Sequence, residues 1–248
     1  MFSVKYPRSL SLLACGAALL ASAPVLADTL VVRASGPSAG SYAPGRKLAD
    51  GASVTLKSGD VLTLLDGKGT RTLRGPGVFG TSVAATGGNA SKFASLIGTR
   101  TTVRARTGAI RSGASDAPPP RSPNLWYVDV RSSATTCIAD PANVVLWRAD
   151  KGTAQTFTVT GKDGKGSIAF AADQATAAWP ATLPVTEGAT YQLTGGGKPV
   201  SLRFTLLAPG GEGLESTAST LIARKCDAQL QLLIETVALP DPAPDMPG

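Results

Sequence analysis

The chain has 248 residues, a formal net charge of +7, three cysteines and no histidine. Without histidine it cannot form a Ser-His-Asp or Cys-His catalytic group, an imidazole metal site or a histidine pH switch. Carboxylates remain available for acid–base chemistry, but their spacing selects no pair. We therefore expect a non-catalytic protein that uses no metal or other cofactor.

Residues 1–27 have the pattern of a cleavable export signal. Lys5 and Arg8 precede an apolar run from Leu10 to Leu20 that is too short to span a bilayer. A small-x-small pattern then predicts cleavage after Ala27. We expect a periplasmic or secreted protein with no transmembrane segment in the mature chain.

A second interpretation of this region remains open. Leu12-Leu13-Ala14-Cys15 can be taken as a lipoprotein box, in which case Cys15 carries a lipid and anchors the protein in a membrane.

Residues 28–88 predict a small β domain, because apolar and polar positions alternate between glycine-containing turns. Asp66-Gly67 lies between two alternating runs, which is a strong hairpin signal. Ser58-Gly59 predicts another turn between short strands.

The stretch from Gly45 to Phe79 combines turn residues with the apolar positions between them, namely Pro44-Gly45, Leu48, Gly51, Val54 to Asp60, Leu64 to Gly67, Leu73 and Gly75. In these residues it resembles the domain of FecR-type periplasmic proteins. It implies a small extracytoplasmic β module used in signalling or scaffolding. The cytoplasmic helical region and transmembrane helix of the signalling members have no counterpart here. The arrangement of the whole chain also resembles other exported bacterial proteins, and that resemblance implies no activity.

Residues 89–121 predict a short helix followed by a basic linker that ends in Pro118-Pro119-Pro120. Asn89 is a candidate N-cap, and Phe93, Leu96 and Ile97 provide the apolar face of the helix.

No acidic residue occurs between Asp66 and Asp116, and this region contains eight basic ones. One interpretation is a solvated linker beside a charge-protected sheet edge. The other is an electropositive surface for an anionic partner such as lipid head groups, cell-wall polymer or an acidic protein. Its candidate binding residues are Arg100, Arg104, Arg106 and Arg111. Nucleic acid is disfavoured because aromatic residues are not interleaved with the basic ones.

Residues 122–208 contain six or seven short alternating runs separated by turns such as Gly161-Lys162-Asp163-Gly164. This spacing predicts an antiparallel β-sandwich, for which we expect an immunoglobulin-like arrangement. Trp147 ends an apolar run and is expected in the core. Trp179 precedes Pro180 in a loop-like context, so it either plugs the end of the sandwich or stacks on a sugar as a possible ligand-binding residue.

Residues 209–239 place apolar side chains three or four positions apart, which predicts one C-terminal amphipathic helix covering the sandwich. Residues 240–248 are proline-rich and are expected to be a disordered tail. Cys137 and Cys226 survive cleavage, and an even pair in an oxidising compartment favours a disulfide over two free thiols. Such a bond would tie the C-terminal segment to the second domain.

The expected architecture is therefore mostly β, with a small FecR-like β domain, an immunoglobulin-like sandwich and a C-terminal helix. The function we expect first is a non-catalytic interaction or scaffold protein of the bacterial envelope, which binds another envelope protein. A cell-wall or polysaccharide-binding protein is the first alternative. A carboxylate-based hydrolase is the second.

Overall fold

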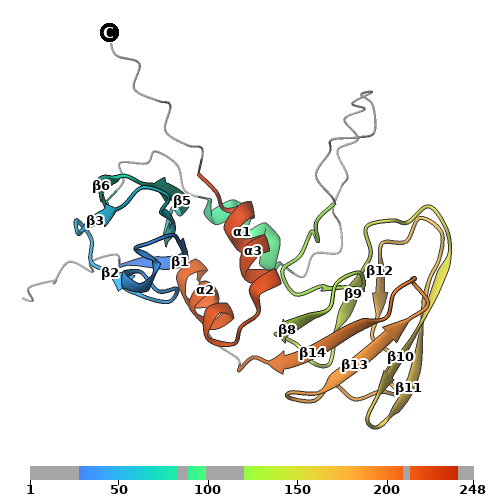
Figure 1. Ribbon diagram of the computed structural model, residues 1–248. Coiled ribbons are helices and arrows are strands. Elements are labelled where there is room, and N and C mark those ends of the chain that lie inside the picture. The colour runs from blue at the N-terminus through green and yellow to red at the C-terminus, as the bar shows by residue number, and fades with distance from the viewer. Residues whose placement is uncertain (1–27, 83–88, 99–119, 209–212, 240–248) are drawn as a thin grey trace, which may run out of the picture.

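The computed structural model describes residues 28–82, 89–98, 120–208 and 213–239. Over these ranges the chain is mostly β, with several antiparallel sheets and α-helices labelled α1 to α3. Figure 1 shows three parts: an N-terminal module of residues 28–82, a sandwich of residues 120–208, and a helical layer of α1, α2 and α3 between them.

The N-terminal module contains a four-stranded antiparallel sheet in the order β2-β1-β4-β5 and a separate β3–β6 ribbon. Their bounds are β1 Thr29–Ser35, β2 Lys47–Leu48, β3 Ser53–Leu56, β4 Val61–Asp66, β5 Gly69–Arg74 and β6 Gly77–Gly80, with a 3₁₀ turn at Ala39–Ser41. The β4–β5 hairpin closes at the pair Asp66 and Gly69, which confirms the turn at Asp66-Gly67. The Ser58-Gly59 turn is also present, but it joins strands of two different sheets.

The main sheet of this module is buried on both faces. On β1, Val31 packs into a core within the module, whereas Leu30 and Val32 pack against the helical layer. The same division separates Leu64 from Leu65 on β4. Successive strand residues point to opposite faces, so a continuous apolar run indicates a strand covered on both sides.

The helical layer contains α1 Ala90–Ile97, α2 Leu214–Ala223 and α3 Asp227–Thr236. Helix α1 confirms the helix predicted after Asn89. The prediction of a single C-terminal helix is wrong, because Lys225 has a φ of 58° and its left-handed backbone separates α2 from α3. The apolar period is nevertheless real, since Leu221 and Leu233 are fully buried.

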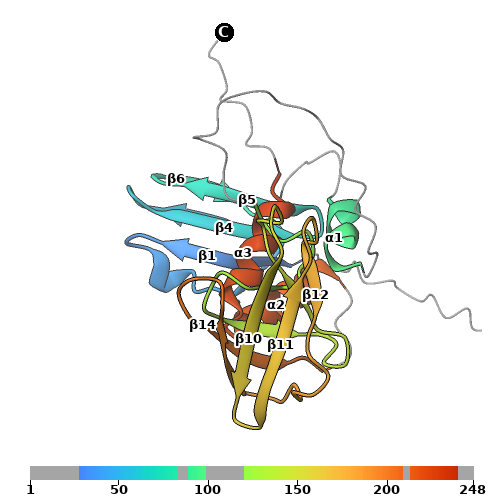
Figure 2. The same ribbon diagram turned by 90° about the vertical axis from the view of Figure 1, so that its right-hand side faces the viewer.

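The two C-terminal helices also pack differently from the prediction. They do not simply cover the sandwich, because α2 contacts β1 and β4, and α3 contacts both β5 and β8. Figure 1 shows them between the N-terminal sheet and the β8–β14 end of the sandwich, and Figure 2 gives the view from the sandwich side. One apolar core therefore joins residues that lie nearly 200 positions apart in the sequence, such as Leu30 and Leu221.

The chain beyond α3 closes the outer edge of β5. The N–H of Thr70 donates to the Val237 carbonyl at 3.0 Å, and the Leu239 N–H donates to the Thr70 carbonyl at 2.8 Å. The Asn89 side-chain amide also donates to the Val237 carbonyl, at 2.7 Å. Asn89 is the N-cap residue of α1, but its side chain makes no capping hydrogen bond, so that part of the capping prediction is wrong.

The sandwich pairs a five-stranded sheet, in the order β11-β10-β13-β14-β8, with a three-stranded sheet, in the order β12-β9-β7. Its strands are β7 Val128–Asp129, β8 Ala134–Ile138, β9 Val145–Trp147, β10 Gln155–Gly161, β11 Gly164–Phe170, β12 Thr176–Ala178, β13 Thr190–Thr194 and β14 Val200–Leu206. The β10–β11 turn falls at Lys162-Asp163, within the predicted loop.

The prediction of a wholly antiparallel sandwich is wrong at two pairs. Strand β8 runs parallel to β14, and β7 runs parallel to β9. The chain crosses from one sheet to the other after β7 and crosses back after β8. Each of these short strands therefore joins its sheet through a crossover instead of a hairpin, which permits parallel pairing.

The sandwich has a core of its own, with aromatic rings at its centre. Phe170 and Phe204 are almost fully buried, and Trp147 is 5 % exposed, which confirms its predicted core position. Within the ranges given above, none of the helices is long and apolar enough to cross a membrane.

Candidate functional site

The predicted disulfide is present. Cys137 on β8 is bonded to Cys226, the residue before α3, with 5.8 Å between their Cα atoms. The bond therefore ties the C-terminal segment to the sandwich, as predicted. It fixes the start of α3 beside the edge of the five-stranded sheet.

Gln229, one turn further along α3, forms a second link to β8. Its side-chain oxygen accepts the Cys137 N–H at 2.7 Å, and its side-chain nitrogen donates to the Cys137 carbonyl at 2.9 Å. The same nitrogen donates to the Leu125 carbonyl at 2.9 Å. Because Gln229 is only 5 % exposed, these bonds satisfy backbone groups that would otherwise be buried without partners. At Cys137, the Gln229 side-chain amide therefore makes the two hydrogen bonds that a neighbouring strand would otherwise make.

A groove of about 350 Å³ lies beside this link, between residues 120–136 and α3. We call it the junction groove. Leu125, Tyr127 and Leu232 give it an apolar floor, and Ala228 on α3 lies at its exposed side. It is bounded by the open edge of the sandwich on one side and by the helical layer on the other.

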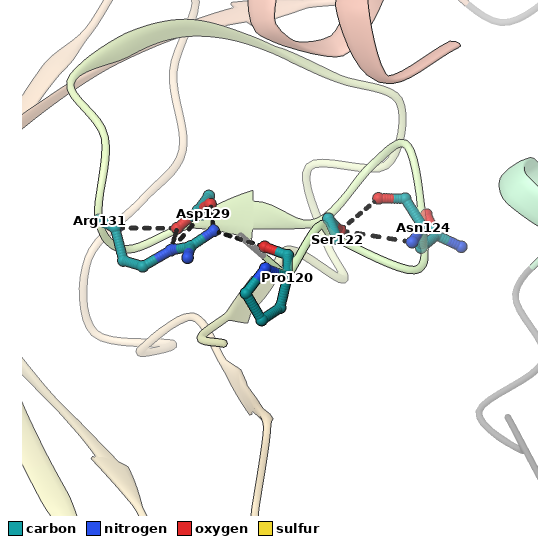
Figure 3. Close-up of polar contacts among 5 residues, drawn as sticks. All are labelled: Pro120, Ser122, Asn124, Asp129 and Arg131. Atoms are coloured by element: carbon teal, nitrogen blue, oxygen red, sulfur yellow. Dashed lines mark hydrogen bonds and ion pairs between the residues drawn. The ribbon is translucent and has the colours of Figure 1, made fainter. Parts of the chain in front are cut away.

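Arg131 and Asp129 form one charged rim of the junction groove (Figure 3). The guanidinium of Arg131 donates through Nε to Oδ1 of Asp129 at 2.9 Å and through Nη2 to Oδ2 at 2.6 Å. It also donates to the Pro120 carbonyl at 3.0 Å and lies over the Trp147 ring, 4.9 Å from its centroid. Hydrogen bonding to Asp129 raises the pKa of Arg131 above its ordinary value. This arrangement fixes the orientation of the cation.

Ser122 and Asn124 order the chain that forms the adjacent wall (Figure 3). The Ser122 hydroxyl donates to the Asn124 carbonyl at 2.7 Å, and the Asn124 side-chain oxygen accepts the Trp126 N–H at 2.8 Å. The Asn124 amide also donates to the carbonyl of Gly98, the residue after α1, at 2.7 Å. The wall is thereby attached to the helical layer.

A second ion pair joins this wall to α3. Arg121 Nη1 lies 2.5 Å from Glu235 Oε2. Gln231 donates to the other Glu235 oxygen and accepts a hydrogen bond from Arg33 on β1. Side chains from all three parts of the molecule therefore contribute to the polar rim or contact it.

An apolar floor with a charged rim is the usual anatomy of a protein-binding surface. The two carboxylates that line the groove, Asp129 and Glu235, are each already paired with an arginine. No group of three His, Cys, Asp or Glu residues suitable for a metal ion occurs in the part of the chain that the structure describes. The groove therefore combines an apolar floor with a rim whose carboxylates are already paired.

A second cleft, of about 440 Å³, lies on the other face of β8. We call it the basic cleft, because three cations line it around a single acid. Its lining residues are Thr135, Glu187, Arg203, Thr205, Ala223, Arg224 and Lys225.

The remaining predicted site residues lie elsewhere. The Trp179 ring packs edge-on against Tyr191 and Phe204, 4.9 and 5.1 Å between centroids, and its indole N–H donates to the Leu183 carbonyl at 2.8 Å. Trp179 is partly buried against the sandwich core and lines neither the groove nor the cleft. Arg100, Arg104, Arg106 and Arg111 lie outside the described residues.

Sequence reasoning missed the junction groove. One signal was available: Gln229 interrupts the apolar face of the C-terminal helices three residues after Cys226. A polar residue in such a position needs a buried partner. The Arg121–Glu235 ion pair of the rim joins residues 114 positions apart and carries no local pattern.

Comparison with protein-family models, curated proteins and solved structures finds no match to this chain.

Proposed function

We propose that this protein is a non-catalytic scaffold of the bacterial envelope that binds a segment of another protein in the junction groove. The observation that carries the proposal is the shared construction of the groove. Its walls come from the edge of the sandwich and from α3, which packs on the N-terminal module as well. A ligand in the groove would contact a surface whose shape depends on both modules being in place.

The proposed location outside the cytoplasm is supported by the Cys137–Cys226 disulfide, since such bonds persist in oxidising compartments. We further propose an export signal at residues 1–27, which lie outside the described residues.

We also propose that the sandwich is immunoglobulin-like. Strands β10, β13 and β14 are adjacent in one sheet, and β9 and β12 pair in the other, as the C-F-G and B-E strands do in that fold. The Tyr191 hydroxyl donates to the Pro184 carbonyl at 2.6 Å, in the manner of a tyrosine corner. The FecR-like nature of residues 45–79 is likewise a proposal, supported by the small β module that these residues form.

The proposal can be tested by site-specific crosslinking in the native envelope. A photoreactive residue replaces Ala228, which is exposed on α3 at the junction groove, and a matched control replaces Ala94, which is exposed on α1 and does not line the groove. We expect one polypeptide to crosslink at position 228 and not at position 94. The Ala228→Arg variant should abolish its recovery by filling the groove, whereas Ala94→Arg should not.

Recovery of polysaccharide alone would contradict the scaffold proposal and favour the glycan-binding alternative. A charge-reversed variant at Arg100, Arg104, Arg106 and Arg111 would then show whether the basic linker is the binding surface. Equal crosslinking at positions 228 and 94 would exclude the junction groove as the specific contact.

A further inference from the structure

The edge of β8 that faces away from β14 offers an open backbone position. In a parallel strand pair, alternate residues direct both backbone groups to the same side. Cys137 directs its N–H and C=O to Gln229, on the side opposite β14. Thr135, two residues earlier, therefore directs its N–H and C=O to that same side. Neither group is hydrogen-bonded to another described residue on that side.

The junction groove and the basic cleft flank this open position on the two faces of the sheet. Ala134 and Thr136 line the junction groove, whereas Thr135 lines the basic cleft. Side chains of a strand alternate between the two faces. A strand added beside Thr135 would therefore place successive side chains alternately in the basic cleft and in the junction groove.

The basic cleft carries an excess of positive charge. Arg203, Arg224 and Lys225 line it together with one acid, Glu187. One Glu187 oxygen accepts the Leu206 N–H at 2.5 Å, and the other lies 4.0 Å from Arg224. Arg203 and Lys225 form no ion pair with any residue in the described ranges. Two cations are thus available to an incoming anion.

The disulfide holds these cations beside the sheet. Cys226 follows Lys225 directly and is bonded to Cys137, two residues after Thr135 on β8. On β14, Arg203 is the register partner of Thr135. The cleft is therefore assembled before a ligand arrives, which lowers the ordering cost of binding.

We propose that the partner binds by strand addition, through an extended segment in which acidic residues alternate with apolar ones. This inference rests on the proposed function and specifies the partner segment. The segment's backbone pairs with Thr135. Its acidic side chains enter the basic cleft, and its apolar side chains reach the apolar floor of the junction groove. The paired edge is short, so the side chains on both faces supply most of the specificity.

The test uses the mature chain and two labelled synthetic peptides of equal composition, followed by fluorescence anisotropy. One peptide alternates glutamate with valine, and the other places all its glutamates before its valines. We expect the alternating peptide to bind about tenfold more tightly, because only it can direct charge to one face and apolar groups to the other.

Two variants separate backbone pairing from charge. Thr135→Pro removes the outward N–H without removing a bond to β14, and should weaken binding of the alternating peptide about fivefold. Arg203→Glu should weaken it about tenfold at low salt. Lys165→Glu, at an exposed lysine on the distant edge strand β11, should leave binding unchanged.

Equal binding of the two peptides would overturn the inference, because a simple anion site does not distinguish them. Binding that is lost in Arg203→Glu but unaffected in Thr135→Pro would overturn it for the same reason. If neither peptide binds while Ala228 still crosslinks a partner, strand addition is wrong and the proposed function stands. If both the peptides and the crosslink fail, the proposed function fails as well.

Discussion

The sandwich and the N-terminal module differ in how their cores are completed. The sandwich buries Phe157, Phe170, Phe204 and their neighbours between its own two sheets. The N-terminal module buries only one face of its main sheet with its own side chains. On the other face, Leu30 and Leu65 are buried by helices that follow the sandwich in the sequence.

The two regions look similar in sequence, but they differ in how far each can complete its core without the rest of the chain. Both consist of short alternating strands and both have an internal core, yet the main sheet of the N-terminal module needs a second core, formed with distant helices, to bury its other face. The helical layer covers the main sheet of the N-terminal module and is attached to the sandwich by the disulfide, by Gln229 and by apolar contacts with Leu125. The junction groove lies where this attachment is made.

The disulfide gives the largest expected effect. Replacing Cys137 and Cys226 together by serine should lower the free energy of unfolding by about 4–5 kcal/mol, because the bond closes a long loop in the unfolded chain. Urea denaturation followed by circular dichroism measures this change. We also expect the transition to split, with the sandwich unfolding last. An unchanged single transition would show that the two regions are coupled without the bond.

Leu233→Ala should lower the free energy of unfolding by about 3 kcal/mol, because Leu233 is fully buried in the helical layer. Hydrogen exchange should accelerate in β1 and β5 more than in β10 and β13. Leu193→Ala, at a position 1 % exposed in the sandwich core, is the matched control and should give the reverse pattern. If both variants loosen both regions equally, the difference in autonomy does not exist.

Gln229→Met should lower the free energy of unfolding by about 2 kcal/mol. Methionine has a similar shape but no amide, so backbone groups of Cys137 and Leu125 would lose their hydrogen-bond partner. Denaturation measures the loss, and the Cys137 amide should exchange faster. Gln231→Met, on the same helix with partners at the surface, should change the free energy of unfolding by less than about 0.5 kcal/mol. If both variants lowered the free energy of unfolding equally, Gln229 would not be the residue that joins α3 to β8.

Asp60 gives the smallest expected effect, and it is specific to the N-terminal module. Burial opposes its ionisation, but hydrogen bonds from the Ser38 N–H at 2.8 Å and the Lys57 N–H at 2.5 Å outweigh this, so the pKa of Asp60 is lowered. A lowered pKa stabilises the folded state above the unfolded-state pKa, and this stability is lost as pH falls through the folded-state value.

The measurement is the urea midpoint of the N-terminal module at neutral pH and near pH 3. Asp60→Asn should reduce the difference between the two midpoints, and Asp163→Asn, in the exposed β10–β11 turn, should not. An unchanged difference in Asp60→Asn would assign the acid sensitivity to other carboxylates.

Local signals predicted much of the fold. The Asp66-Gly67 hairpin, the β10–β11 turn and the amphipathic face of the C-terminal helices depend on residues close in sequence, and all are present. The disulfide could be predicted from compartment and parity of the cysteines. What the helices cover could not be predicted, because periodicity identifies an apolar face and does not identify the surface against which it packs.

The candidate site could not be predicted for the same reason, because it depends on which distant surfaces pack together. Gln229 and Glu235 have the spacing of ordinary helix residues, and their partners Cys137 and Arg121 belong to a distant segment. The break at Lys225 was also hidden, because lysine is not a residue that usually marks a left-handed position. Trp179 was prominent in the sequence because of its type, although its ring packs among the aromatic side chains of the sandwich.

The hydrogen bonds between Thr70 and the residues that follow α3 have a consequence for the order of assembly. A chain emerges from the ribosome or a translocation pore from its N-terminus. The N-terminal sheet is then the first part made, but its β5 edge and its helix-facing side lack their partners until Val237 has followed. The two sheets of the sandwich can close as soon as β14 has been made. The N-terminal module is therefore made before the sandwich but enclosed after it, and a chain truncated before Val237 would leave the β5 edge without its partner.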